Sequence, residues 1–145
     1  MSGPLNLHAS CVLLGEAGVL IRGESGVGKS GLAVRLVAAR RAAGRFAAHV
    51  SDDRTLVEAT HGRLIARPHP AIAGLVERRG LGLARVPHES AAILRLVVDL
   101  HRERASRLPD EDERTVRIEG VTLPRLAGLA DDVASLVEEA LSWPG

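Results

Sequence analysis

Residues 23–30 have the sequence Gly-Glu-Ser-Gly-Val-Gly-Lys-Ser, which is a complete phosphate-binding loop of the form GxxxxGK[ST]. Lys29 in this loop is the only lysine among the 19 basic residues of the chain, and the other basic residues are arginines. A compact ammonium on a thin stem fits beneath a loop that wraps a phosphate, whereas a guanidinium is a wide planar fork. The loop therefore constrains the fold first, because it requires a strand before it and a helix after it.

The residue types of the loop predict that it binds a nucleotide or a phosphate. Gly23, Gly26 and Gly28 allow backbone conformations that a Cβ forbids, so that successive N–H groups turn inward and form a nest for phosphate oxygens. We expect Lys29 to reach the β- and γ-phosphates of ATP and the Ser30 hydroxyl to ligate Mg²⁺. The expected cofactor-binding residues are Gly23, Glu24, Ser25, Gly26, Val27, Gly28, Lys29 and Ser30.

Composition limits the other functions open to this chain. A length of 145 residues with 46% apolar residues predicts one globular domain over residues 1–145. The formal net charge of +1 gives no general attraction to nucleic acid or anionic membranes, and one Phe, one Trp and no Tyr offer no platform for stacking bases. Without a long uncharged apolar run or a basic N-terminal region, the sequence predicts a cytoplasmic protein with no membrane or nucleic-acid partner.

Hydrophobic patterning predicts many short strands and two helices. Helical spacing over residues 30–41 and 129–141 predicts one helix in each segment, with Gly44 ending the first. The expected strands are residues 10–14, 18–22, 46–50, 55–58, 63–67, 93–100, 116–118 and 121–123. Because many strands are joined by hairpin-length links, we expect an α/β domain whose mixed, largely antiparallel sheet carries the phosphate loop.

Phosphoryl transfer also needs a carboxylate near Mg²⁺ and a group that orients or deprotonates the acceptor. The first candidates are Asp52 and Asp53, which follow the strand after the first helix. The second candidate is Asp99, at the end of an apolar strand of Walker B type. Each of these can equally be a polar residue at the corner between a strand and a turn. Pattern alone leaves the two candidates close to even.

The sequence resembles the catalytic domain of HPr kinase/phosphorylase, a bacterial enzyme that phosphorylates a serine of the phosphocarrier protein HPr. Beside the phosphate loop, the matching stretches are His8-Ala-Ser10, Val50-Ser-Asp-Asp53, Val76–Gly82 and Arg107-Leu108. The loop is common to many NTPases, whereas its combination with Asp-Asp and with a sequence close to Glu-x-Arg-Gly-Leu-Gly is far more specific. The resemblance implies a P-loop kinase fold related to phosphoenolpyruvate carboxykinase.

The resemblance also implies roles for individual residues. Asp52 would take the proton from the acceptor serine, and His8 would lie nearby to orient it. Ser30, Glu77 and Asp53 would hold Mg²⁺, whereas Lys29 and Arg107 would stabilise phosphoryl charge. The expected partners are an HPr-like phosphocarrier and further copies of this chain, commonly in a hexamer. Taken from the residues alone, Arg107 can instead pair with a nearby acid such as Asp110 or Glu111, and Glu77 with Arg79.

The chain departs from the family pattern in three places. It begins almost at His8, as in a short form that lacks the N-terminal domain of longer members. Residues 123–128 keep only Pro124 and Arg125 of the loop that accompanies dephosphorylation, the attack of phosphate on phosphoserine that releases pyrophosphate. Arg78 adds a cation within the signature stretch. Two other functions fit the loop: a small-molecule kinase, and an ATP sensor without catalysis.

Overall fold

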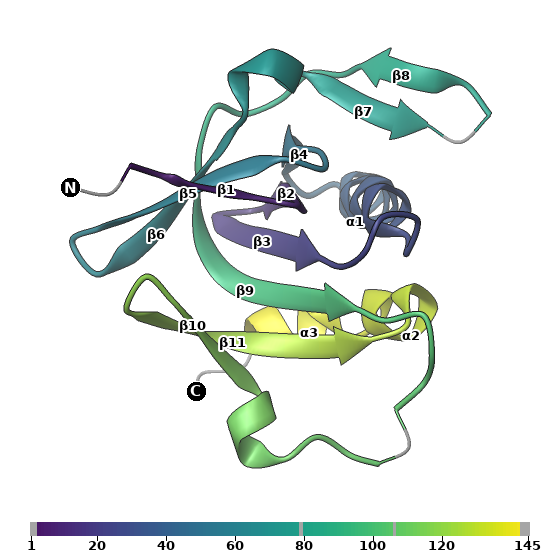
Figure 1. Ribbon diagram of the computed structural model, residues 1–145. Coiled ribbons are helices and arrows are strands. Elements are labelled where there is room, and N and C mark those ends of the chain that lie inside the picture. Colours follow the sequence, from purple (N-terminus) through teal and green to yellow (C-terminus); the bar gives the residue numbers. More distant parts are fainter. Residues whose placement is uncertain (1–2, 79, 106, 143–145) are drawn as a thin grey trace.

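The computed structural model describes residues 3–78, 80–105 and 107–142 (Figure 1). Its strands are β1 (Leu5–Leu7), β2 (Ala9–Leu14), β3 (Ala17–Arg22), β4 (Ala47–Ser51), β5 (Thr55–Thr60), β6 (Arg63–Pro68), β7 (Leu75–Arg78), β8 (Gly82–Arg85), β9 (Ala92–Leu100), β10 (Thr115–Ile118) and β11 (Val121–Gly128). The helices are α1 (Lys29–Ala42), α2 (Ala130–Ala134) and α3 (Val137–Ser142), with 3₁₀ turns η1 (Pro70–Ile72) and η2 (Glu111–Glu113).

Nine strands form one mixed sheet in the order β1-β5-β6-β9-β3-β2-β4, with β11 paired to β9 and to β10. Only the pairs β3–β9 and β9–β11 are parallel in the described sheet, so the predicted largely antiparallel sheet is confirmed. Strand β9 is the central strand, since β3 pairs along one edge while β6 and β11 share the other. The carboxyl ends of β3, β9 and β11 therefore meet at one edge of the sheet.

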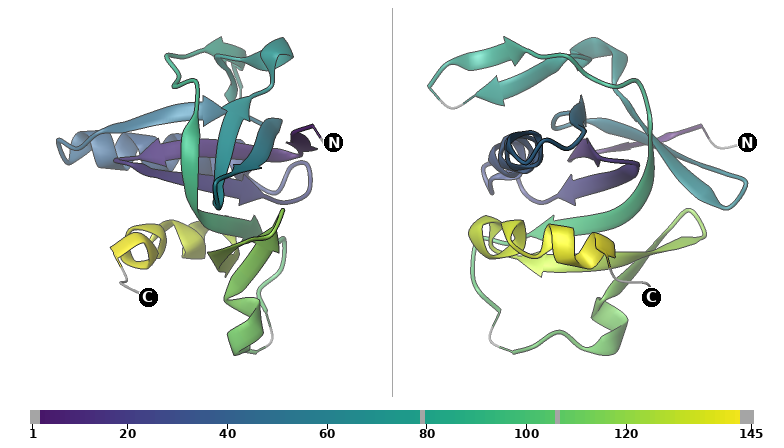
Figure 2. Two further views of the ribbon diagram at one scale, coloured as in Figure 1. Left: turned by 90° about the vertical axis from the view of Figure 1, so that its left-hand side faces the viewer. Right: turned by 180° about the vertical axis from the view of Figure 1, so that it is seen from behind.

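Both faces of the central strands are buried, which explains why these strands are continuous apolar runs in the sequence. Along β3, Val19 and Ile21 pack with Leu32 and Leu36 of the helical layer, whereas Leu20 packs on the opposite face. The hairpins β5–β6 and β10–β11 cover that second face, and Figures 1 and 2 show the helices gathered on the first. The β7–β8 hairpin projects from the sheet as an arm at one end of the molecule (Figure 1).

Most predicted elements are confirmed, but the strands β1, β7 and β8 were not predicted and the second helix differs. The three-residue strand β1, which pairs with β5, is too short to leave a pattern in the sequence. The helix expected over residues 129–141 is divided into α2 and α3. At the break, Ser135 Oγ donates to the carbonyl of Asp132 at 3.0 Å, and such a bond competes with regular helical bonding. Val133 and Val137 on either side are both buried, so the apolar face survives the break.

The central position of β9 predicts a large effect from truncating its buried side chains. Replacing Leu96, which is 1% exposed, by alanine should lower the free energy of unfolding by about 2–5 kcal/mol. The neighbouring Arg95 is exposed, and Arg95→Ala should change stability by less than about 0.5 kcal/mol. Urea unfolding followed by circular dichroism measures both values. Equal losses for the two variants would contradict the central role of β9.

Candidate functional site

The phosphate loop joins β3 to α1 and has the backbone conformation that its glycines predict. Gly23, Gly26 and Gly28 have φ values of 152°, 82° and 110°. At Gly23 the space is also closed, because a Cβ would lie 2.7 Å from Val27 Cγ1 and 3.0 Å from the Leu100 carbonyl oxygen. The first N–H groups of α1 have no partner within the helix, so the loop and helix together present donors to an anion.

Lys29 lies beneath this loop with only 6% of its side chain exposed. Its ammonium donates to the carbonyl oxygens of Gly23 at 2.8 Å and Glu24 at 3.1 Å. It also lies 4.0 Å from a carboxylate oxygen of Asp53. The only lysine of the chain is therefore held at the centre of the loop, within reach of an acid on the neighbouring segment.

Asp52 is buried and connects three parts of the site. Its Oδ1 accepts hydrogen bonds from the hydroxyls of Ser10 and Ser30, each at 2.7 Å. Its Oδ2 accepts a bond from the backbone N–H of Glu77 at 2.9 Å. Two expected Mg²⁺ ligands, Ser30 and Glu77, are thus brought to the same carboxylate, although the Glu77 side chain is exposed on the arm.

Asp53 has a different environment from Asp52. It adopts a left-handed conformation with φ of 64°, and 54% of its side chain is exposed. His8 Nδ1 lies 3.6 Å from Asp53 Oδ1, on the same carboxylate that faces Lys29. His8 was expected to lie near Asp52; the ion pair that it makes is with Asp53, because the turn after β4 directs the second aspartate outward while the first is buried.

The signature stretch after Asp53 is placed only in part. Glu77 and Arg78 end strand β7. Arg79 lies outside the described residues, so its suggested pair with Glu77 also lies outside them.

The charge of Arg78 affects His49, a buried residue of β4. Burial, followed by the charges of Arg41 and Arg78, lowers the pKa of His49, while Asp52 opposes this shift. The neutral form of His49 is therefore favoured by its surroundings.

The contacts of Arg107 differ from those that its expected role needs. Its guanidinium binds Glu113 at 2.8 Å, Asp110 at 3.4 Å and the Leu108 carbonyl at 3.1 Å. Among the described residues, all of its side-chain hydrogen bonds and ion pairs lie within this exposed segment. The local pairing that the sequence allowed is confirmed for Asp110, while Glu113 takes the place expected for Glu111.

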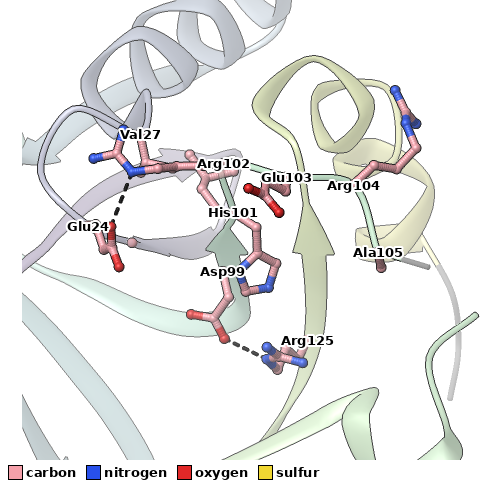
Figure 3. Close-up of a pocket in the computed structure, with 11 residues that line it drawn as sticks. Glu24, Val27, Asp99, His101, Arg102, Glu103, Arg104, Ala105 and Arg125 are labelled. Atoms are coloured by element: carbon pink, nitrogen blue, oxygen red, sulfur yellow. Dashed lines mark hydrogen bonds and ion pairs between the residues drawn. The ribbon is translucent and has the colours of Figure 1, made fainter. Parts of the chain in front are cut away.

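A different arginine contacts the phosphate loop. Arg102 follows β9, and its guanidinium donates to the Glu24 carboxylate at 3.1 Å and to the Ser25 carbonyl at 2.7 Å. Figure 3 shows Arg102 reaching across to Glu24. The sequence does not reveal this contact, because Arg102 is one of several arginines in a charged segment and no local pattern distinguishes it.

Asp99 is held by two arginines. Arg22 binds it through two hydrogen bonds of 2.7 and 2.8 Å, and Arg125 binds its Oδ2 as well. Burial alone would raise the pKa of Asp99, but the hydrogen bonds from Arg22 and Arg125 outweigh burial and leave the pKa below its ordinary value. Both of its carboxylate oxygens are engaged, so this carboxylate joins strand ends beneath the loop, whereas Asp52 and Asp53 face the loop.

The residues at the loop suit a magnesium nucleotide. Mg²⁺ prefers a few hard oxygen ligands and retains water and phosphate oxygens for its other positions. Ser30, Asp52 and Asp53 supply hydroxyl and carboxylate oxygens of this kind on one flank of the loop, where the backbone N–H of Glu77 is bonded to Asp52. The loop amides and Lys29 supply donors for phosphate. This arrangement can bind a nucleotide and present its terminal phosphate to a base.

The lowered pKa of Asp99 predicts a pH-dependent contribution to stability. The contribution is present above the ordinary pKa of 3.8 and is lost as the pH falls through the lower pKa of the folded state. Asp99→Asn should therefore lower the unfolding free energy at pH 6, and this deficit should shrink as the pH falls below about 4. Urea titrations across this pH range measure the deficit. A deficit independent of pH would show that ionisation of Asp99 contributes nothing.

Comparisons with known proteins identify the family. The sequence matches the HPr Serine kinase C-terminal domain over residues 1–141. It is 26% identical to HPr kinase/phosphorylase of Mycoplasma mycoides subsp. mycoides SC over 93% of this chain and 46% of that protein. It is 31% identical to the Neisseria meningitidis serogroup C protein of that name over 87% of this chain and 42% of that protein. The chain thus spans less than half the length of these curated relatives.

A solved structure supports the fold. The Hpr(Ser) kinase/phosphatase from Coxiella burnetii superposes with a TM-score of 0.75 at 23% identity, covering 94% of this chain and 93% of that chain. At that identity the likeness establishes the architecture, and it agrees with the predicted P-loop kinase fold. In the described residues, no helix has the length and apolar character needed to cross a membrane. By its sequence match, this chain belongs to the HPr serine kinase C-terminal domain family.

Proposed function

We propose that this domain transfers the terminal phosphoryl group of Mg²⁺-bound ATP to a seryl hydroxyl of an HPr-like phosphocarrier, and so regulates a phosphotransferase system. One observation carries the proposal: the Asp53 carboxylate lies between His8 and Lys29 at the opening of the phosphate loop, at 3.6 and 4.0 Å. A half-exposed carboxylate in this position can meet a hydroxyl that approaches from solvent. A cytoplasmic homo-oligomer, such as a hexamer, fits this function.

The contacts favour an exchange of the roles first expected for the two aspartates. Asp53 is the base that accepts the seryl proton, and His8 orients its carboxylate. Asp52, already bonded to the Ser30 hydroxyl, belongs with Ser30 and Glu77 as a holder of Mg²⁺. When bound, Mg²⁺ would supply charge compensation for the phosphate oxygens. Lys29 stabilises the charge that develops on the transferred group.

Two arginines have a smaller part in this proposal. The role expected for Arg107 would require its guanidinium to leave Glu113 and Asp110, so we assign the stabilisation of phosphoryl charge to Lys29 alone.

The reverse reaction would cleave the phosphoserine by attack of inorganic phosphate on its phosphorus. Asp53 would return the proton to the seryl oxygen, and the phosphoryl group would leave as pyrophosphate. Arg125, retained from the dephosphorylation loop, is engaged by Asp99 and the Glu113 carbonyl. We therefore propose that the kinase direction dominates.

The proposal is tested by incubating the protein with Mg²⁺, ATP and a panel of HPr-like carriers, followed by mass spectrometry of the carriers. The expected result is one phosphate on a serine, and added inorganic phosphate should release little pyrophosphate. Phosphate on a histidine would contradict the proposal. ATP binding without transfer would favour a sensor, and transfer only to small hydroxylated compounds would favour a small-molecule kinase.

The two aspartates should respond differently to amide substitution. Asp53→Asn should lower kcat by about 10²–10⁴-fold and leave the ATP dissociation constant nearly unchanged, because it removes the base alone. Asp52→Asn should instead raise the Mg²⁺ concentration needed for half-maximal rate. Asp112→Asn, at an exposed aspartate of η2, is the matched control.

Steady-state kinetics with a Mg²⁺ titration measure these differences. The reverse pattern would be an active Asp53→Asn variant and an Asp52→Asn variant that loses transfer at every Mg²⁺ concentration. It would favour the roles first expected, with Asp52 as the base. An additional measurement of ATP binding by calorimetry separates loss of the base from loss of the nucleotide.

A further inference from the structure

An open cleft lies against the phosphate loop on the flank away from Asp52 and Asp53. Its volume is about 620 Å³, and it is lined by the loop, by residues 99–105 and by Arg125 (Figure 3). A smaller hollow of about 370 Å³ adjoins it and is lined by residues 129–131 as well. The two share Val27, His101 and Arg102. Together they have the size of a small-molecule site.

The topology explains why the cleft is there. Parallel pairing places Arg22 of β3 opposite Asp99 of β9, and Leu100 of β9 opposite Gly128 of β11. Three segments therefore lie side by side at this edge of the sheet. The phosphate loop follows β3, residues 101–105 follow β9 and residues 129–131 follow β11. Crevices outside the carboxyl ends of parallel strands are the usual ligand sites of such sheets.

The two flanks of the loop differ in chemistry. The strand order β9-β3-β2-β4 puts the segment after β4, with Asp52 and Asp53, on one side of the loop and the cleft on the other. A nucleotide with its phosphates in the loop and its terminal phosphate toward Lys29 and Asp53 extends its other end away from them. We propose that the cleft binds the nucleoside portion of the phosphate donor and that Arg102 contacts it. This inference rests on the proposed function for the identity of the donor.

The charges in the cleft favour a nucleoside over a second anion. Each arginine that lines it already contacts a carboxylate: Arg102 binds Glu24, Arg104 binds Asp132 and Arg125 binds Asp99. An anionic effector would have to displace these carboxylates. An uncharged base and sugar need no such exchange, and they can lie against the apolar atoms of Val27, Leu100 and Leu129.

Arg102 is the residue best placed to recognise a base. Its side chain is more than half exposed, and it lies at the boundary of the two hollows. The chain has one Phe, one Trp and no Tyr, so aromatic platforms are scarce. A planar guanidinium stacks on a π-system, and its fixation by Glu24 and the Ser25 carbonyl reduces the entropy lost when a base binds.

The test compares ATP with inorganic tripolyphosphate, which carries the phosphate chain without a nucleoside. Calorimetric titrations in Mg²⁺ should show that Arg102→Ala weakens ATP binding roughly tenfold and tripolyphosphate binding less than about twofold. Lys29→Ala should weaken the binding of both ATP and tripolyphosphate. Arg102→Lys should restore little ATP affinity, because it returns the charge without the planar fork. Arg63→Ala, at an exposed arginine of β6, is the control.

Three results would overturn the inference. Arg102→Ala could weaken the binding of both ligands equally, which would mean that Arg102 only supports the loop, or it could weaken the binding of neither. The third is that the wild-type protein binds tripolyphosphate as tightly as ATP. Glu24→Gln separates support from contact, since it removes the ion pair that fixes Arg102 and should weaken ATP binding less than Arg102→Ala does. Binding needs no phosphoryl transfer. A protein that fails to phosphorylate any carrier but shows the expected binding pattern would disprove the proposed function and retain this inference.

Discussion

The buried carboxylate of Asp52 is the interaction on which the geometry of the site depends. Its donors come from three separate elements: Ser10 of β2, Ser30 at the start of α1 and the backbone of Glu77 on β7. A buried carboxylate has to be satisfied by hydrogen bonds, because an unpaired charge away from water is costly. Satisfying this one group fixes the end of the sheet, the beginning of the helix and the base of the projecting arm relative to one another.

The position of Asp53 follows from the anchoring of Asp52. The chain turns sharply after β4, with the N–H of Arg54 bonded to the Asp52 carbonyl at 2.7 Å and with Asp53 in the left-handed region. Aspartate tolerates this conformation better than most residues. The turn directs the second carboxylate toward Lys29 and His8 while the first stays buried. Two adjacent residues of the same type are therefore suited to different chemical tasks.

Structure that is set by local spacing could be predicted from the sequence. The phosphate loop, α1 and the hairpins each depend on residues close together in the chain. The ion pair of His8 with Asp53 could not be predicted, because the direction of a side chain after a strand depends on what anchors its neighbour, here Asp52. The contact of Arg102 with the loop was missed because it requires the parallel register of β9 beside β3, a pairing between residues about 77 positions apart. A helical pattern likewise cannot show that the Ser135 hydroxyl will interrupt the helix.

The arginines and the single lysine of the chain have different partners in the structure. Arg35 and Arg40 bind acids of the two C-terminal helices, and Arg22 and Arg125 close the strand ends beneath the loop. Such paired guanidinium groups hold elements together and present little free charge to a passing phosphate. The ammonium of Lys29 is bonded to loop carbonyls, which are weaker partners than carboxylates and can be exchanged for phosphate oxygens. Pairing of these four arginines therefore leaves the ammonium of Lys29 as the cation that the loop itself offers to a triphosphate.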